Sequence, residues 1–94
     1  MTHDYQALAN DLNGALAKLH KEIPATMQGF SMMAKPALQE GALSAKDKEL
    51  IALAIGIAGR CQGCLAFHTK ALVKLECSRA EFMEMLQIAV YMGG

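Results

Sequence analysis

Residues 44–68 have the sequence SAKDKELIALAIGIAGRCQGCLAFH, which combines an apolar run with two cysteines and a histidine. Ser44 is a residue type that favours a helix N-cap, and the charged residues after it suit a first helical turn. Periodicity alone would also fit a buried strand, but the length of the run with its polar start favours a helix. The stretch therefore predicts a helix over about 45–58, a break at Gly59 and a further helix over about 61–75.

The rest of the chain also shows helical patterns. Pro24 ends a first helix and suits the first position of a second, and we expect Pro36 to kink or stop that second helix. Ser78 and Glu81 form a capping-box pattern for a last helix that ends near Met92. The first helix carries an apolar stripe at spacings of three and four: Tyr5, Leu8, Leu12, Leu16, Leu19 and Ile23. We predict an all-α bundle of about five helices, a single domain over residues 1–94, with the cysteine pair at the amino terminus of the fourth helix.

Composition limits what one subunit can bury. The chain has 94 residues, of which 53% are hydrophobic. A domain of this size buries only about 60% of the surface that its unfolded chain exposes. We expect the seven methionines to fill the core, and some of the remaining apolar surface to lie between subunits. The prediction is a homo-oligomer, with a hexamer favoured over a trimer.

Charge and hydropathy argue against two classes of partner. Nine Lys and Arg balance nine Asp and Glu without a run of either sign, so the sequence indicates no surface for nucleic acid or an anionic membrane. The longest apolar run, Leu50 to Gly59, has 10 residues, whereas a membrane-spanning helix needs about 20. The first residues show no pattern of an export signal. We expect a cytoplasmic protein that binds neither nucleic acid nor membrane.

Two of the three cysteines are arranged for chemistry within one helical turn. Cys61 and Cys64 form a CxxC pair, and His68 follows one turn after Cys64. On a helix the three share one face, and the cysteines fall within the Cα separation of about 4.4 to 6.8 Å that a disulfide tolerates. His68 can accept the Cys64 proton, while the helix amino terminus and Arg60 favour a thiolate. The pair is a candidate redox dithiol.

Glu49 is a carboxylate on an otherwise apolar helix face. It shares a stripe with Gly56 and several aliphatic residues, and a carboxylate in that setting needs a partner. If the helices on either side of the break pack as a hairpin, Glu49 approaches His68 and holds its tautomer or relays a proton. The alternative is that Glu49 pairs with Lys46 or Lys48 on the outside of its own helix.

These residues resemble a known family signature. The spacing is similar to the active-site pattern of the alkylhydroperoxidase D-like branch of the carboxymuconolactone decarboxylase superfamily, carried here by Glu49, Cys61, Cys64 and His68. The flanking segments GALSAKDKELIALAIGIAGRCQGCLAFHTKAL and SRAEFMEMLQIAVYMGG also resemble the family, so the motif core covers about residues 41–94. Cys77 stands where members usually have a small residue. We expect Cys77 to be structural, packed against Phe82.

The resemblance implies an all-helical oligomer with thiol-dependent peroxidase or disulfide-reductase activity. It implies that the second cysteine, Cys64, attacks a hydroperoxide with help from His68 and Glu49, and that Cys61 resolves the product. An external dithiol or thiol protein would then restore both cysteines, and no bound cofactor is required. The decarboxylases of the superfamily lack the CxxC, which argues against lactone decarboxylation.

Two other classes of function stay open at this point. The first is a zinc-binding helical module that uses Cys61, Cys64, His68 and, as a fourth ligand, Glu49, although structural zinc sites usually draw their ligand pairs from separate elements. The second is a non-catalytic helical assembly protein with an idle dithiol.

Overall fold

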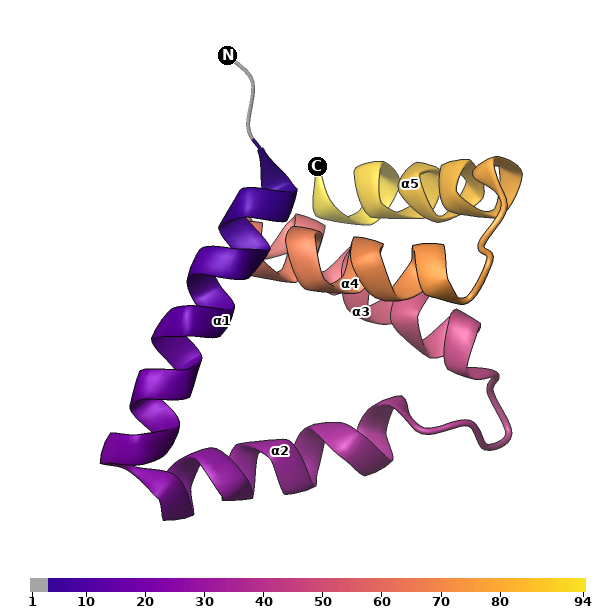
Figure 1. Ribbon diagram of the computed structural model, residues 1–94. Helices are drawn as coiled ribbons and strands as arrows, with labels where there is room; N and C mark the ends of the chain where they lie inside the picture. The colour runs from indigo at the N-terminus through magenta and orange to yellow at the C-terminus, as the bar shows by residue number, and fades with distance from the viewer. Residues whose placement is uncertain (1–3) are drawn as a thin grey trace.

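The structure, a computed structural model, describes residues 4–94 of the chain. Within them five helices follow one another and no strand occurs, which confirms the predicted all-α class (Figure 1). The helices are α1 (Tyr5–Glu22), α2 (Pro24–Leu38), α3 (Ala45–Ala58), α4 (Gln62–Lys74) and α5 (Arg79–Gly93).

The last three helices begin at side-chain caps. The Ser44 hydroxyl accepts a hydrogen bond from the Asp47 N–H at 3.0 Å, so α3 spans the predicted residues. At the start of α5, Ser78 and Glu81 exchange the two hydrogen bonds of a capping box, as predicted. Cys61 is the N-cap of α4, which places the CxxC at the amino terminus of the fourth helix.

The first two helices meet at a proline, and a second proline lies inside α2. Pro24 is the first residue of α2, where its missing N–H removes no helical hydrogen bond. The prediction that Pro36 stops α2 is wrong, because the helix continues through Pro36 and ends at Leu38. Since only two residues follow Pro36, the lost backbone hydrogen bond affects the last turn alone.

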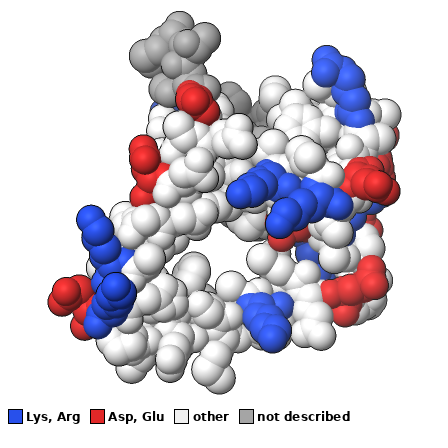
Figure 2. Space-filling model, in the orientation of Figure 1, with Lys and Arg blue, Asp and Glu red and all other residues white. Residues whose placement is uncertain are grey.

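The helices form two regions, which we call the body and the arm. The body consists of α3, α4 and α5, which lie side by side, and the arm consists of α1 and α2 (Figure 1). Helix α1 packs against α4, and α2 returns along the far side of the molecule to the start of α3. In the space-filling view an opening lies between α2 and the body (Figure 2).

The buried core belongs to the body. Leu53 is fully buried between α4 and α5, together with Leu72, Met85 and Ala89. In contrast, α2 has no buried residue. The expectation that the methionines fill the core holds for Met85 but is wrong for Met32 and Met33 of α2 and for Met92 of α5, because these three are exposed. Both regions therefore expose apolar side chains, but only the body also has a buried core.

Among residues 4–94, no helix combines the length and the apolar character that crossing a membrane requires.

Candidate dithiol site

The site begins with the reversal of the chain between α3 and α4. Arg60 adopts a left-handed backbone conformation with φ 55°, directly after the C-cap residue Gly59. The Cys61 N–H then donates a hydrogen bond of 2.9 Å to the Gly56 carbonyl oxygen. This turn folds α4 back along α3 as an antiparallel hairpin, which brings the carboxyl half of α3 opposite the first turn of α4.

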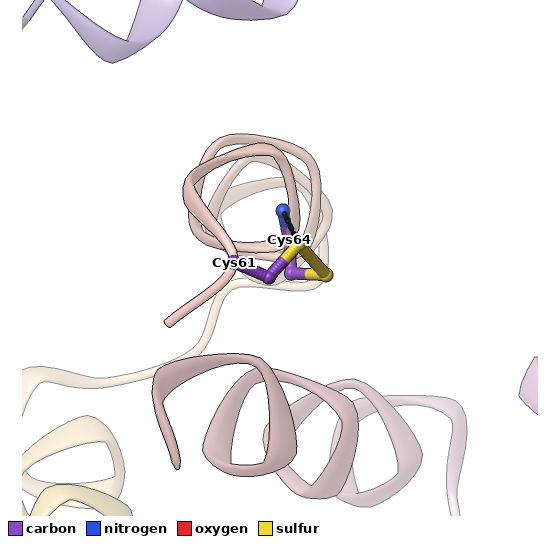
Figure 3. Close-up of a disulfide and its surroundings, with 2 residues drawn as sticks. All are labelled: Cys61 and Cys64. Carbon is purple, nitrogen blue, oxygen red and sulfur yellow. Dashed lines mark hydrogen bonds between the residues drawn. A yellow bond between two sulfur atoms is a disulfide. The ribbon is translucent and has the colours of Figure 1, made fainter. Parts of the chain in front are cut away.

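Cys61 and Cys64 form a disulfide across the first turn of α4 (Figure 3). Their Cα atoms are 5.2 Å apart, well within the range that disulfides tolerate. The Cys61 Sγ also accepts a hydrogen bond of 3.1 Å from the Cys64 N–H, as an N-cap side chain does. A helix can therefore hold both sulfurs without any break in its backbone.

Glu49 and His68 form the second half of the site. A hydrogen bond of 2.6 Å joins His68 Nδ1, the donor, to Glu49 Oε2. Glu49 is only 8% exposed, and a buried carboxylate without such a partner would be costly. The predicted approach of the two residues across the hairpin is confirmed.

The alternative partners of Glu49 are engaged elsewhere. Lys46 forms an ion pair with Glu81 on α5, with its Nζ 2.6 Å from Glu81 Oε2. Lys48 donates a hydrogen bond of 2.6 Å to the Gln39 carbonyl oxygen. The alternative, in which Glu49 pairs with a lysine on its own helix, is therefore wrong.

The disulfide and the Glu49–His68 pair lie along the same seam. His68 contacts Glu49 of α3. Cys64, which lies one turn before His68 on α4, packs against Gly56 of α3. Figure 3 shows the disulfide on the side of α4 that faces α3. All four predicted site residues are thus brought to the α3–α4 seam. Gly56 also belongs there, and its only sequence signal was its place on the Glu49 stripe.

A metal site is not formed by these groups. Across residues 4–94, no three His, Cys, Asp or Glu side chains are arranged to hold a metal ion. Cys77, the free cysteine of the described residues, lies at the α4–α5 connection, and both it and Phe82 pack against the body core.

Fold and site together define an all-helical protein with a CxxC disulfide at a helix amino terminus and, on the same helix seam, a histidine paired with a buried glutamate. The family model for the carboxymuconolactone decarboxylase family matches residues 24–94. The chain belongs to this family. Its Glu, CxxC and His residues are consistent with the alkylhydroperoxidase D-like branch.

Known relatives agree with this assignment. The crystal structure of apo-lpg0406, a carboxymuconolactone decarboxylase family protein from Legionella pneumophila, superimposes with a TM-score of 0.93 at 48% identity, over 96% of this chain and 80% of that one. An uncharacterized protein of Cupriavidus necator is 35% identical over the whole chain and 83% of its own length. An uncharacterized protein of Haemophilus influenzae is 30% identical over 74% of this chain and 62% of its own length.

Proposed function

We propose that the protein is a thiol-dependent peroxidase or disulfide reductase that uses Cys61 and Cys64 as its redox couple. The observation that carries the proposal is the placement of this couple one helical turn from a histidine that a buried carboxylate holds. Because a carboxylate oxygen accepts, His68 Nδ1 is the donor to Glu49, which leaves Nε2 as the ring nitrogen proposed to exchange a proton with the dithiol.

In the first step the Cys64 thiolate attacks the outer oxygen of a hydroperoxide. The sulfur supplies an electron pair to form an S–O bond, the O–O bond breaks, and an alcohol leaves after it takes a proton. The products are a sulfenic acid at Cys64 and the alcohol. The role proposed for His68 is to take the thiol proton and return it to the leaving oxygen.

In the second step Cys61 attacks the Cys64 sulfur. The disulfide forms and water leaves, which gives the state that the structure contains. An external dithiol then supplies two electrons and two protons, reduces the disulfide and becomes a disulfide itself. This demand for a reductant fits a reducing compartment, and we propose the cytoplasm as the place of action.

Two physical effects compete for the choice of attacking sulfur. The Cys61 sulfur is the N-cap acceptor, and charge at a helix end contributes typically about 0.3 to 1 kcal/mol. Cys64 lies on the same face as His68, and general-base assistance contributes roughly 3 to 5 kcal/mol to rate. The larger effect favours Cys64 as the nucleophile.

Single-turnover peroxide consumption by cysteine variants tests the assignment. Cys61→Ser should consume one equivalent of peroxide and accumulate a sulfenic acid at Cys64 that dimedone labels. Cys64→Ser should lose this first turnover. Dimedone labelling of Cys61 in Cys64→Ser at the wild-type rate would reverse the two roles, and no turnover by the wild type with several dithiol donors would refute the peroxidase.

We also propose that copies of the chain associate, with a hexamer favoured over a trimer. Helix α2 buries none of its residues within one subunit, yet Phe30 is 62% exposed and its neighbours Met32 and Met33 are exposed as well. The charged side chains visible in Figure 2 leave most of α2 uncovered. An isolated helix of this length is only marginally stable in water, so contacts with another copy would stabilise it.

A second uncovered apolar surface supports the same proposal. A groove runs between α3 and α5 and is lined by aliphatic side chains that include Ile51, Ile55 and Ile88. Acidic residues, among them Asp47 and Glu84, lie at its rim. Exposed apolar surface with a polar rim is typical of subunit interfaces.

A further inference from the structure

Gly56 occupies a position where a side chain would collide with the dithiol. A Cβ at Gly56 would lie 2.6 Å from the Cys64 Cβ and 3.6 Å from the Cys64 Sγ. Glycine in the middle of a helix costs stability relative to alanine, so its presence in α3 needs a reason. The close approach of Cys64 to the α3 backbone supplies that reason.

The same glycine also contacts the other cysteine. Its carbonyl oxygen accepts the hydrogen bond from the Cys61 N–H at 2.9 Å. When the disulfide is formed, three links join Gly56, Cys61 and Cys64 in a ring. They are the hydrogen bond from Cys61 to Gly56, the disulfide, and the van der Waals contact of Cys64 with Gly56. Cys64 cannot move away from α3 in this state without pulling on Cys61.

Two other glycines in the helices have no such neighbours. Gly14 in α1 and Gly29 in α2 would carry a Cβ with no atom within 4 Å. Alanine at either position should be neutral or stabilising, because it lowers the conformational entropy of the unfolded chain. These two positions therefore provide matched controls for the same substitution in a helix.

We propose that Gly56 is a positioning residue that sets the redox equilibrium of the Cys61–Cys64 couple. The inference deepens the proposed function, since it concerns the couple that the proposed cycle uses. In the equilibrium concerned, the disulfide takes two electrons and two protons from a dithiol and becomes two thiols, while the dithiol becomes a disulfide.

This ring of three links predicts which redox form a methyl group at position 56 destabilises more. A methyl group at position 56 must push the first turn of α4 away from α3. In the reduced protein only the weak hydrogen bond from the Cys64 N–H to the Cys61 sulfur resists a shift of Cys64. In the oxidised protein the covalent disulfide transmits the strain to the hydrogen bond between Cys61 and Gly56. The added methyl group therefore destabilises the oxidised form more, and the disulfide of the variant is easier to reduce.

The test is a redox titration of Gly56→Ala in dithiothreitol buffers, with the disulfide quantified by alkylation and mass shift. We expect the equilibrium constant to move about tenfold toward the dithiol, which is about 30 mV for a two-electron couple. Gly14→Ala and Gly29→Ala should titrate like the wild type. Met85→Ala, a core substitution on α5, should lower the melting temperature without a change in midpoint.

A second version of Gly56→Ala, in a background with more stable helices, provides a test if the single variant does not fold. Gly56→Ala is also made with Gly14→Ala and Gly29→Ala, and the midpoint of this triple variant is compared with that of the double control. An unchanged midpoint in a folded Gly56→Ala protein, or an equal shift in Met85→Ala, would overturn the proposal. Because the titration contains no peroxide, its result is independent of whether the protein turns over hydroperoxides.

Discussion

The body and the arm are both rich in apolar residues, yet they use them differently. The body buries Leu53, Leu72 and Met85 in one core and holds the dithiol seam on two of its helices. In the arm, as far as residues 5–38 show, Ala9 is the one buried residue. The difference teaches that the site depends on contacts within one chain, whereas the apolar side chains of the arm have few contacts within it.

The largest effect that we expect concerns chemistry within the body. His68→Gln removes the proposed base, one helical turn after Cys64, while it keeps a polar side chain next to Glu49. The first turnover with peroxide should slow by about 10²- to 10⁴-fold, the usual contribution of general-base catalysis. Stopped-flow measurement of peroxide consumption by the reduced protein provides the rate.

A matched variant separates the role of the carboxylate. Glu49→Gln keeps a hydrogen-bond acceptor for His68 Nδ1 but removes the charge, so the same rate should fall to a smaller extent. Circular dichroism should show unchanged helicity in both variants. A wild-type first turnover in His68→Gln would place the essential base elsewhere.

The second prediction compares the two regions directly. Leu53→Ala removes a fully buried side chain from the body core and should lower the free energy of unfolding by about 2 to 5 kcal/mol. Leu19→Ala removes the same atoms from α1, where the residue is 43% exposed, and should cost much less. Urea denaturation followed by circular dichroism gives both values, and equal losses would contradict a core confined to the body.

Much of the body could be predicted from sequence because its signals are local. Ser44, Ser78 and Glu81 satisfy backbone groups within one turn, so the starts of α3 and α5 follow from residue types alone. The meeting of Glu49 and His68 needed one added step, the hairpin at Gly59. That step succeeded because a carboxylate on an apolar face has few other solutions.

What the sequence did not reveal depends on packing between elements. A side chain at position 56 would collide with Cys64 only because α4 packs against α3 at that residue, and no local sequence pattern predicts this contact. Likewise, the apolar residues of α2 have the same sequence pattern as a buried helix. The spacing of Met27, Phe30 and Met33 suits one face of a helix, but it does not predict what covers that face.

The third prediction tests what covers the arm. Phe30→Glu places a charge on the exposed apolar surface of α2. If another copy buries this residue, the substitution forfeits at least the roughly 1.5 to 3 kcal/mol of a buried phenylalanine, so the dissociation constant should rise at least about tenfold. Light scattering over a dilution series measures the effect.

The matched control is Gln28→Glu, which adds the same charge at an exposed polar position of the same helix. It should leave association unchanged. In both variants the disulfide couple should retain its midpoint, because the body holds its own site. A wild-type protein that is monomeric at micromolar concentration would refute the association itself.

The smallest expected effect lies in the ion pair that joins the starts of α3 and α5. Hydrogen bonding to Lys46, aided by the bonds with Ser78, lowers the pKa of Glu81 from its usual 4.5 to about 2, and the same bond to Glu81 raises the pKa of Lys46. A lowered carboxyl pKa contributes stability that is present above about pH 4.5 and is lost as the pH falls toward 2. The raised lysine pKa contributes below its usual 10.5 and is lost at more alkaline pH.

Glu81→Gln isolates this charge, because glutamine at the same position can keep the capping box. The melting temperature of the wild type should exceed that of the variant at pH 6, and the difference should vanish between about pH 4.5 and 2. Both side chains lie at the surface, so 1 M salt should also remove most of the difference. If the difference in melting temperature persisted unchanged at pH 2 and in high salt, the contact would act through packing of α3 on α5. The charge of Glu81 would then contribute nothing to the stability of the body.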